Sequence, residues 1–383
     1  MKTKNLFSLL VLFSLLACTG THKLQKNDLV QYVDPYIGSG YHGHVFVGTS
    51  TPYGMVQLGP SNIHKGWDWC SAYHHSDSIV IGFSHTHLNG TGCTDLGDIL
   101  LMPYTGDICT IRGEQEDISN GYASYYSHDN EVVRPDYYSL LIDRYNIKAE
   151  LTTSDRVGFH KYTFPKGEEA RVIIDLKEGN GDEAFDTYIK QLDEYTLEGY
   201  RFSNGWATHK VFFTLKSDVA LKDFNVFYDT EAREGKELTG PSVKGVLSFG
   251  TQGGEVQFKV GISPVSCENA AKNIEAEIKD WNFAQVMEQN RSKWNAELNK
   301  IQIDTKDDVL RRTFYTSLYH TMVAPSLFND YNGEFRLQDD QIYTTEGKNL
   351  STFSLWDTYR ALHPLMSIIH PEKQADIINS MLA

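Results

Sequence analysis

The first part of the chain, from about Asn27 to Pro264, consists of short runs of β-branched and aromatic residues separated by Gly, Asn, Asp and Pro. Such runs are typical of β-strands bounded by turns. The clearest are residues 99–102, 137–142, 157–164, 171–176, 209–215, 246–249 and 256–260. Several alternate apolar and polar side chains, which puts one face against a core. We therefore predict a large antiparallel β-sandwich over residues 27–264.

The hydrophobic period changes to that of helices after Ser266. Ile274, Ile278 and Trp281 follow a helical spacing, and a second stretch after Asn282 continues it. The pattern predicts a helical linker over residues 265–300, between the sandwich and a helical domain.

Residues 301–383 also show helical spacing. Thr305 and Asp308 resemble a capping pair at the start of a helix, which Pro325 is expected to end. A second helix is predicted to start near Ser354 and to be kinked or ended by Pro364. A third begins at Pro371, a favourable first helical position. Residues 301–383 are therefore predicted to contain the first helices of a helical domain.

The N-terminus has the pattern of a targeting segment. Two lysines precede an apolar stretch from Leu6 to Ala17, which is too short to span a bilayer as a helix. Leu15–Cys18 resembles the bacterial lipobox, whose cysteine is lipidated, so residues 1–18 are predicted to be a lipoprotein signal with Cys18 as the lipidated residue. An ordinary signal with a chance cysteine is the alternative. The first interpretation places the mature protein in the periplasm or on the cell surface, bound to a membrane only through a lipid anchor.

Composition narrows the possible partners. The chain has 35 basic and 50 acidic side chains, a net charge of −15, and no run of Lys and Arg. The negative electrostatic field of such a chain repels the phosphate backbones of nucleic acids, so we expect no nucleic-acid partner. No phosphate-binding loop, nucleophile elbow or dinucleotide fingerprint occurs in a matching context. The four cysteines after Cys18 can be either disulfide-bonded or free thiols.

Half of the 14 histidines fall within residues 42–87. The pairs His42/His44 and His85/His87 have the spacing that puts two imidazoles on one face of a strand, which suits either a transition metal or hydrogen bonds to sugar hydroxyls. No third metal ligand is identifiable in the sequence.

Trp67 and Asp68 combine an aromatic face with a carboxylate. The C–H face of a pyranose can stack on the indole while the acid accepts its hydroxyl hydrogens, so this stretch is a candidate sugar-binding site. The alternative is that Trp67 and Trp69 fill the sandwich core.

Paired acids would be the chemistry of a glycosidase. The candidates by residue type are Asp95, Asp98, Asp307, Asp308, Asp339, Asp340 and Asp357. Asp357 is the most suggestive, because Trp356, Tyr359 and Arg360 lie within one turn of it and could hold a sugar ring. An aspartate in a first helical turn can equally act only as a helix-stabilising charge.

These motifs together resemble glycoside hydrolase family 92, the calcium-dependent, exo-acting α-mannosidases. The resemblance runs in order from about residue 30 to the end of the chain. It rests on Asp34–Gly38, Gly43–Phe46, Pro52–Pro60, Gly82–Cys93, Arg156–His160, Leu318–Met322 and Phe353–Arg360.

The resemblance implies a β-supersandwich joined through helices to an (α/α)₆ toroid. It implies hydrolysis of α-mannosidic bonds, often α-1,2, with inversion, and a Ca²⁺ ion that contacts mannose hydroxyls, a role that suits a hard cation. By position, Trp356 and Asp357 correspond to the pair that holds mannose, and Phe46 and Cys93 lie on loops near the terminal sugar. The calcium ligands in this chain are not identified.

The resemblance also implies that the general acid and base lie beyond the last residue, so no catalytic residue is assigned here. We expect this chain to carry only the start of the toroid, as a fragment, a truncated gene model or a degenerate copy. Two alternatives to an exported α-mannosidase acting on mannose-rich glycans remain open. One is a carbohydrate-binding lipoprotein without catalysis; the other is a mutarotase-like or metal-dependent enzyme built on the sandwich alone.

Overall fold

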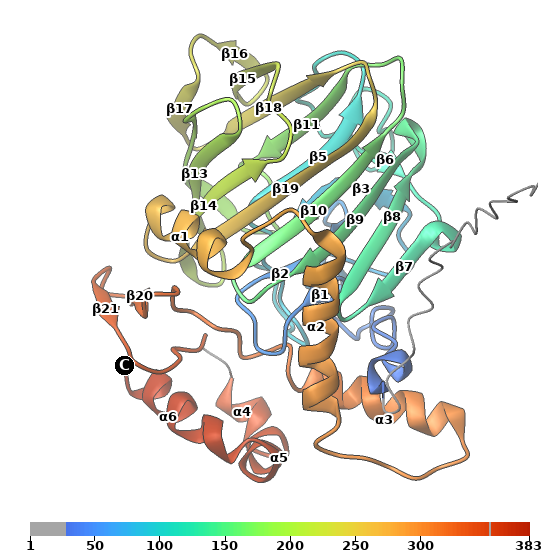
Figure 1. Cartoon of the computed structure of the whole chain (residues 1–383), viewed down its shortest axis with the longest axis vertical. Helices are drawn as coiled ribbons and strands as arrows, with labels where there is room; N and C mark the ends of the chain where they lie inside the picture. The colour runs from blue at the N-terminus through green and yellow to red at the C-terminus, as the bar shows by residue number, and fades with distance from the viewer. Residues whose placement is uncertain (1–27, 352–353) are drawn as a thin grey trace, which may run out of the picture.

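A computed structural model describes residues 28–351 and 354–383 of the chain (Figure 1). Within these residues, strands dominate up to Ser263, and helices dominate from Cys267 onward. The order of β-sandwich followed by helices confirms the predicted fold class. The predicted signal at residues 1–18, including Cys18, lies outside the described residues.

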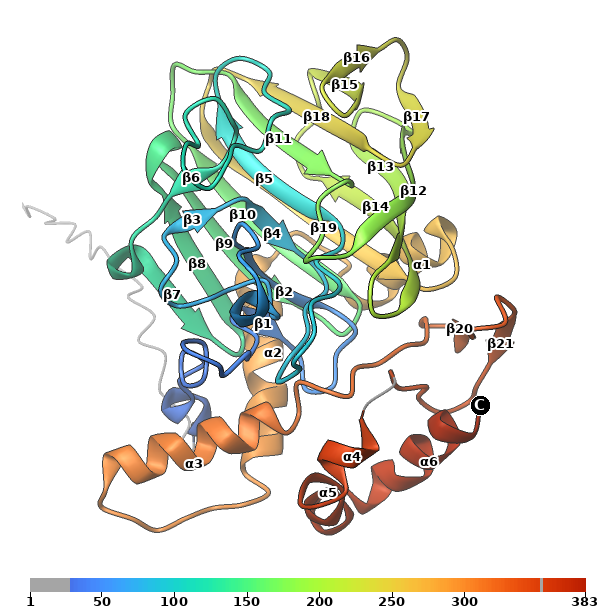
Figure 2. The same ribbon diagram turned by 180° about the vertical axis from the view of Figure 1, so that it is seen from behind.

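Two large antiparallel sheets face each other and form the sandwich (Figures 1 and 2). The first sheet has the strand order β1 (Thr49–Ser50), β2 (Gln57–Ser61), β4 (Gly82–Ser84), β5 (Leu100–Thr105), β11 (Ala170–Asp175), β18 (Val243–Gly250), β15 (Asp223–Tyr228) and β16 (Glu231–Arg233). The second has the order β17 (Glu237–Gly240), β12 (Glu183–Gln191), β13 (Thr196–Asn204), β14 (Thr208–Ser217), β19 (Gly254–Ser263), β10 (Val157–Phe164), β9 (Ile147–Thr153), β8 (Tyr137–Ile142) and β7 (Glu131–Arg134). Two small sheets pair β3 (Ile79–Val80) with β6 (Ser124–Tyr125), and β20 (Glu334–Arg336) with β21 (Ile342–Thr344).

The apolar positions of the strands meet between the two sheets. Six of the seven runs identified from the sequence lie wholly or almost wholly within strands, and the seventh, residues 99–102, overlaps the start of β5. Val172 and Ile174 of β11 are buried in the same cluster as Leu215 of β14 and Val260 of β19. Burial of these side chains from both sheets is the main driving force for the sandwich.

Six α-helices lie in the described part after residue 263. They are α1 (Cys267–Glu277), α2 (Phe283–Leu298), α3 (Asp308–His320), α4 (Leu355–Thr358), α5 (Leu362–Ile369) and α6 (Gln374–Leu382). Short 3₁₀ turns include η1 (Leu29–Tyr32), η2 (Trp67–Trp69) and η5 (Pro371–Lys373). Pro371 therefore opens a 3₁₀ turn that runs into α6.

Three details of the predicted helices are wrong. The cap of α3 is Asp307, whose side chain accepts from the backbone N–H groups of Val309 and Leu310, and not the Thr305 and Asp308 pair. The same helix ends at His320, five residues before Pro325, in a turn capped at Thr321. The helix predicted from Ser354 is two helices, α4 and α5.

Proline chemistry accounts for the division between α4 and α5. Pro364 is the third residue of α5, so its missing N–H falls in the first turn, where backbone donors have no intrahelical partner. A continuous helix would instead place the proline ring against the carbonyl four residues earlier. The break therefore precedes Pro364.

The helices attach to the sandwich through two apolar clusters. Ile274 near the end of α1 and Phe283 of α2 pack on Phe159, which faces outward from β10. In the second cluster, Trp294 of α2 and Tyr319 of α3 pack with residues of η1 and of the loop before β1. None of the helices in residues 28–351 and 354–383 is long and apolar enough to cross a membrane.

Candidate functional site

Three loops come together at one end of the sandwich. Trp67 of η2 donates its indole N–H to the carbonyl of Gly92 at 2.9 Å, and its ring contacts His44 edge-on, with centroids 4.3 Å apart. His42 lies 2.6 Å from Asp68, and the nearer ring nitrogen of His44 lies 3.5 Å from the same carboxylate oxygen. The loop of residues 38–48, η2 and the loop of residues 85–98 thus form a joined surface, which we call the loop cluster.

Side chains of the loop cluster are available for polar recognition. The Trp67 side chain is 55% exposed, so it does not fill the sandwich core, and Trp69 is only partly buried, with its indole N–H bonded to Asp77. A hydrogen bond from His42 holds the pKa of Asp68 below its ordinary value. The carboxylate is therefore ionised at neutral pH and can accept hydrogen bonds from hydroxyl groups.

Phe46 and Cys93 occupy different environments. The Phe46 side chain is fully buried and belongs to the cluster that joins the sandwich to the helices, while its backbone N–H donates to Asn89. Cys93 is partly exposed beside Gly92, and burial raises the pKa of its thiol. Both residues therefore belong to the loop cluster, but only Cys93 presents a side chain at its surface.

Trp356 and Asp357 lie on α4, in the C-terminal helical part. Both side chains are exposed, Trp356 at 69%, and the guanidinium of Arg360 lies 4.7 Å from the centre of the indole. In Figure 2, the loop that follows β4 extends from the sandwich on the side where α4 lies. Among the described residues, no hydrogen bond, ion pair or ring contact joins these two residues to Trp67 or Asp68.

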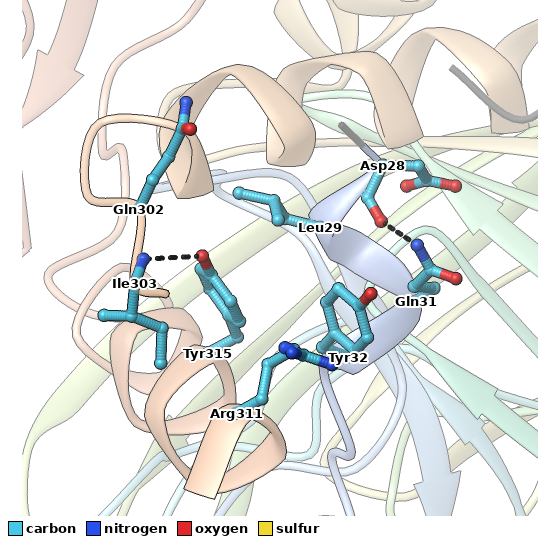
Figure 3. Close-up of a pocket in the computed structure, with 8 residues that line it drawn as sticks. All are labelled: Asp28, Leu29, Gln31, Tyr32, Gln302, Ile303, Arg311 and Tyr315. Atoms are coloured by element: carbon cyan, nitrogen blue, oxygen red, sulfur yellow. Dashed lines mark hydrogen bonds between the residues drawn. The ribbon is translucent and has the colours of Figure 1, made fainter. Parts of the chain in front are cut away.

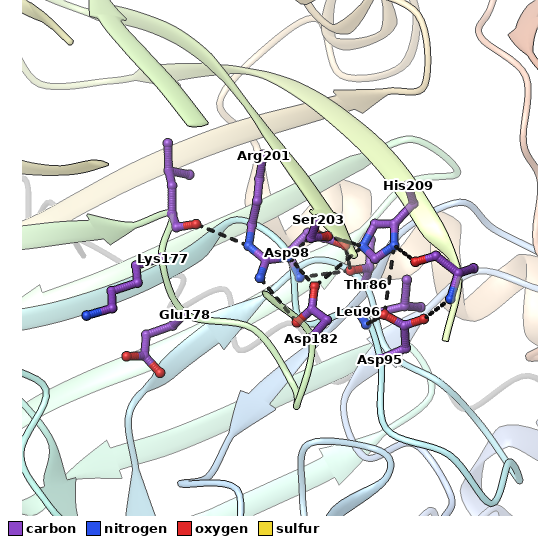
Figure 4. Close-up of polar contacts among 12 residues, drawn as sticks. Thr86, Asp95, Leu96, Asp98, Lys177, Glu178, Asp182, Arg201, Ser203 and His209 are labelled. Carbon is purple, nitrogen blue, oxygen red and sulfur yellow. Dashed lines mark hydrogen bonds and ion pairs between the residues drawn. The ribbon is translucent and has the colours of Figure 1, made fainter. Parts of the chain in front are cut away.

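A buried ion-pair network lies beside the loop cluster (Figure 4). Arg201 of β13 is fully buried and bonds Asp98 and Asp182, each at 2.7 Å. His209 of β14 lies 3.2 Å from Asp98, and Asp98 also accepts a hydrogen bond from Thr86 at 2.7 Å. The network connects the loop after β4 with β13 and β14.

The network includes a possible metal-ligand group. Among the described residues, Asp95, Asp182 and His209 form one group of three whose ligand atoms lie within 4.8 Å of one another. Burial disfavours the charged ring, yet the carboxylate of Asp98, helped by Asp95 and Asp182, raises the pKa of His209 to about 9. Burial likewise opposes ionisation of Asp98, but His209 and Arg201 keep its pKa well below the ordinary range.

These protonation states do not suit a metal site. A protonated imidazole has no free lone pair to donate to a cation, and Arg201 already pairs with Asp182, one of the two carboxylates of the group. The network is best described as a set of ion pairs that fixes the surrounding loops.

Sequence reasoning named Asp95 and Asp98 only by residue type and missed Arg201, Asp182 and His209. The alternation of residues along β13 could have identified Arg201. On β13, buried and partly exposed residues alternate, and Arg201 falls on a buried position of that pattern. A charged residue on the inward face of a strand requires a buried partner of opposite charge.

The paired histidines do not form a metal site in the described part of the chain. His85 and His87 are buried and bond backbone carbonyls of Ile99 and Gln57. The remaining candidate acids make surface contacts. Asp307 caps α3, and Asp308, Asp339 and Asp340 bond Arg311, Tyr343 and Lys210, respectively.

A cavity of about 270 Å³ lies elsewhere, between η1 and α3 (Figure 3). It is lined by Asp28, Leu29, Gln31, Tyr32, Gln302, Ile303, Arg311 and Tyr315. The rings of Tyr32 and Tyr315 stack, and the Tyr315 hydroxyl accepts from the N–H of Ile303. Because this cavity contains none of the predicted site residues, we do not assign it to the candidate site.

Comparison with known families agrees with this arrangement. Residues 32–263 match the glycosyl hydrolase family 92 N-terminal domain, and residues 269–383 match the glycosyl hydrolase family 92 catalytic domain. The chain belongs to glycosyl hydrolase family 92. The resemblance expected from the motifs is thereby confirmed, and the boundary between the two matches falls where strands give way to helices.

Solved members of family 92 share the fold. The α-mannosidase BT3965 from Bacteroides thetaiotaomicron, in complex with mannoimidazole, is 36% identical, with a TM-score of 0.90 over 93% of this chain. The inverting mannosidase BT2199 from the same organism is 23% identical, with a TM-score of 0.79 over 90% of this chain, and shows the fold alone.

A curated relative from Arthroderma benhamiae, described as an uncharacterized secreted glycosidase, is 28% identical over 370 residues, which is 88% of this chain. The chain spans about half the length of these relatives, 46% of the Arthroderma protein and 48% of BT3965. All three chains therefore extend well beyond the matched part.

The four cysteines of the described residues, Cys70, Cys93, Cys109 and Cys267, are free thiols. The sequence left open whether these cysteines are disulfide-bonded or free, and the structure supports free thiols.

Proposed function

We propose that the whole protein is an exported α-mannosidase that removes terminal mannose, α-1,2-linked, from mannose-rich glycans with inversion. The likeness to an α-mannosidase holding mannoimidazole, at 36% identity over 93% of this chain, carries the proposal. Export is supported by the N-terminal apolar segment and by a relative described as secreted.

Exposed groups on the sandwich and on α4 support sugar binding. In the loop cluster, Trp67 offers an aromatic ring and Asp68 an ionised carboxylate, the two groups that a pyranose needs for stacking and for hydroxyl recognition. On α4, Trp356 and Asp357 offer an exposed aromatic ring and an exposed carboxyl group. We propose that Trp356 and Asp357 hold the terminal mannose and that the loop cluster lies near it, with Cys93 beside it.

We include calcium in the proposal only because of the family resemblance. Ca²⁺ is bound by six to eight oxygen ligands. The three-residue ligand group found among the described residues offers two carboxylates and one imidazole nitrogen, so it does not supply the set of oxygen ligands that this ion prefers. We therefore assign no calcium ligand in this chain and derive no catalytic step from the ion.

The activity test uses the protein expressed from its complete gene with an α-1,2-mannobiose. We expect release of mannose that stops on chelation with EGTA and returns with added Ca²⁺. Asp357→Asn should lower kcat about 10–100-fold, since a hydrogen bond to a charged group contributes about 1.5–3 kcal/mol. Its Tm should be nearly unchanged, because Asp357 is exposed.

The matched control is Asp308→Asn, another exposed aspartate in a first helical turn, which should keep full activity. Absence of hydrolysis together with retained mannoside binding would contradict the enzymatic proposal and favour a carbohydrate-binding lipoprotein. Full activity in Asp357→Asn would remove that residue from the site.

A further inference from the structure

The hairpin between β13 and β14 presents a tryptophan at its tip. Residues 205–207 form the turn, and Trp206 is 79% exposed. Within residues 28–351 and 354–383, no aromatic ring or cation packs on its indole. Most of the indole is therefore accessible to a ligand in the described part of the chain.

The backbone on either side of Trp206 is held in place. The N–H of Ala207 donates to a carboxylate oxygen of Asp95 at 2.9 Å, and the N–H of Gly205 donates to the carbonyl of Ala207 at 3.1 Å. A Cβ on Gly205 would come within 2.4 Å of the other Asp95 oxygen, so glycine is needed for this close approach. Trp206 is thus an exposed ring on an anchored turn.

The ion-pair network supports the same anchor. Asp95 follows Cys93 and Gly92 on the loop after β4, and Gly92 accepts the indole N–H of Trp67. On the same hairpin, His209 of β14 interacts with Asp98, and Asp98 is bonded to the buried Arg201 of β13 (Figure 4). One loop therefore connects the loop cluster at Trp67 with the hairpin at Trp206.

The chemistry around the tip suits a neutral sugar. A bare indole stacks on the C–H face of a pyranose. The exposed Asn204 and Thr208, on either side of the turn, supply an amide and a hydroxyl for sugar hydroxyls. Asp95, Asp182 and the overall charge of −15 disfavour a phosphate-bearing ligand.

We propose that Trp206 forms an outer sugar-binding subsite, which stacks on a ring of the glycan beyond the terminal residue. This inference rests on the proposed function, because it assigns the outer part of the same mannose-rich ligand. The ion-pair network acts here as a positioning device for the hairpin.

The test compares a short ligand with a long one. The protein is expressed from its complete gene as wild type, Trp206→Ala and Trp206→Tyr. Calorimetry measures its dissociation constants for methyl 1-thio-α-mannoside and for a linear mannotetraose with sulfur in place of each glycosidic oxygen, because thioglycosides resist hydrolysis. We expect Trp206→Ala to weaken mannotetraose binding about three- to tenfold, the range for loss of one aromatic contact, with methyl mannoside binding unchanged. Trp206→Tyr should restore most of the affinity.

The matched control is Tyr125→Ala. Tyr125 is an aromatic residue on β6 that is 52% exposed, and the variant should bind both ligands as wild type does.

The outcomes separate this inference from the proposed function. Unchanged mannotetraose affinity in Trp206→Ala, beside normal methyl mannoside binding, would overturn the outer subsite alone. Failure of the wild-type protein to bind either mannoside would overturn the proposed function and this inference with it.

Discussion

At the scale of single residues, the sandwich core contains a chain of hydrogen bonds through two histidines. Nδ1 of His85 lies 2.7 Å from the carbonyl of Ile99, so it carries the proton, and Nε2 accepts from Nε2–H of His160 at 3.0 Å. Nδ1 of His160 then accepts from the Tyr162 hydroxyl at 2.8 Å. A second proton on His85 would set two N–H groups against each other, so this ring is neutral in the folded protein. Burial disfavours a charge on His160, which is neutral as well.

This arrangement predicts a loss of stability in mild acid. Burial lowers the pKa of His85 to about 4 and that of His160 well below its ordinary value. Because the unfolded chain takes up protons near pH 6.5 and the folded chain does not, the stabilisation is fully present above pH 6.5 and declines as the pH falls toward 4. Each histidine should contribute a slope of about 1.4 kcal/mol per pH unit in the free energy of unfolding.

The measurement is urea unfolding at several pH values between 7.5 and 5. His160→Phe removes one titrating group, so it should reduce the slope by about 1.4 kcal/mol per pH unit, even though its overall stability is lower. Ile173→Val, in the apolar core, lowers stability without removing a titrating group, so it should keep the wild-type slope. An unchanged slope in His160→Phe would show that His160 is protonated in the folded state.

At the scale of elements, one arginine adds a polar link between α1 and the sandwich to the apolar contacts of Ile274. Arg156, just before β10, bonds Glu277 at the end of α1 at 2.7 Å and the carbonyl of Asn329 at 2.7 Å. The two charged side chains are only 12% and 13% exposed. A single side chain thereby connects a strand, a helix and the segment that leads to β20.

We expect Arg156→Met to lower the free energy of unfolding by about 1.5–3 kcal/mol, the contribution of hydrogen bonds to a charged group. Hydrogen exchange should increase mainly in α1 and in residues 326–331. Lys293→Met is the matched control, because it breaks the neighbouring but more exposed pair with Asp155, which should contribute less than about 1 kcal/mol. Equal effects of the two variants would contradict the role given to Arg156.

At the scale of the whole molecule, the interpretation of residues 1–18 as a lipoprotein signal stays a prediction of the sequence. Cys18→Ala should release the mature protein from membranes into the soluble fraction, because the anchor is expected to be the acylated cysteine. Fractionation and immunoblotting measure this, with Cys109→Ala, at a free thiol of the sandwich, as the control. Membrane association that survives Cys18→Ala would contradict the lipobox interpretation.

The sequence by itself determined the local elements and the family. Strand and helix periods depend on the spacing of apolar residues along the chain, so the runs that became β8, β10 and β19 were visible without the fold. Local patterns also put Trp67 beside Asp68 and Trp356 beside Asp357. They were less reliable at helix ends, since Asp307 rather than the Thr305 and Asp308 pair supplies the cap of α3.

Only the tertiary structure decided which distant residues meet. Asp98 and Arg201 are 103 positions apart, and His85 and His160 are 75 apart. No local period encodes such pairs, because they arise when two sheets fold over a shared core and when buried charges require partners. The exposure of Trp67 and Trp206 and the burial of Phe46 were likewise set by packing, since the same aromatic residue can fill a core or line a surface.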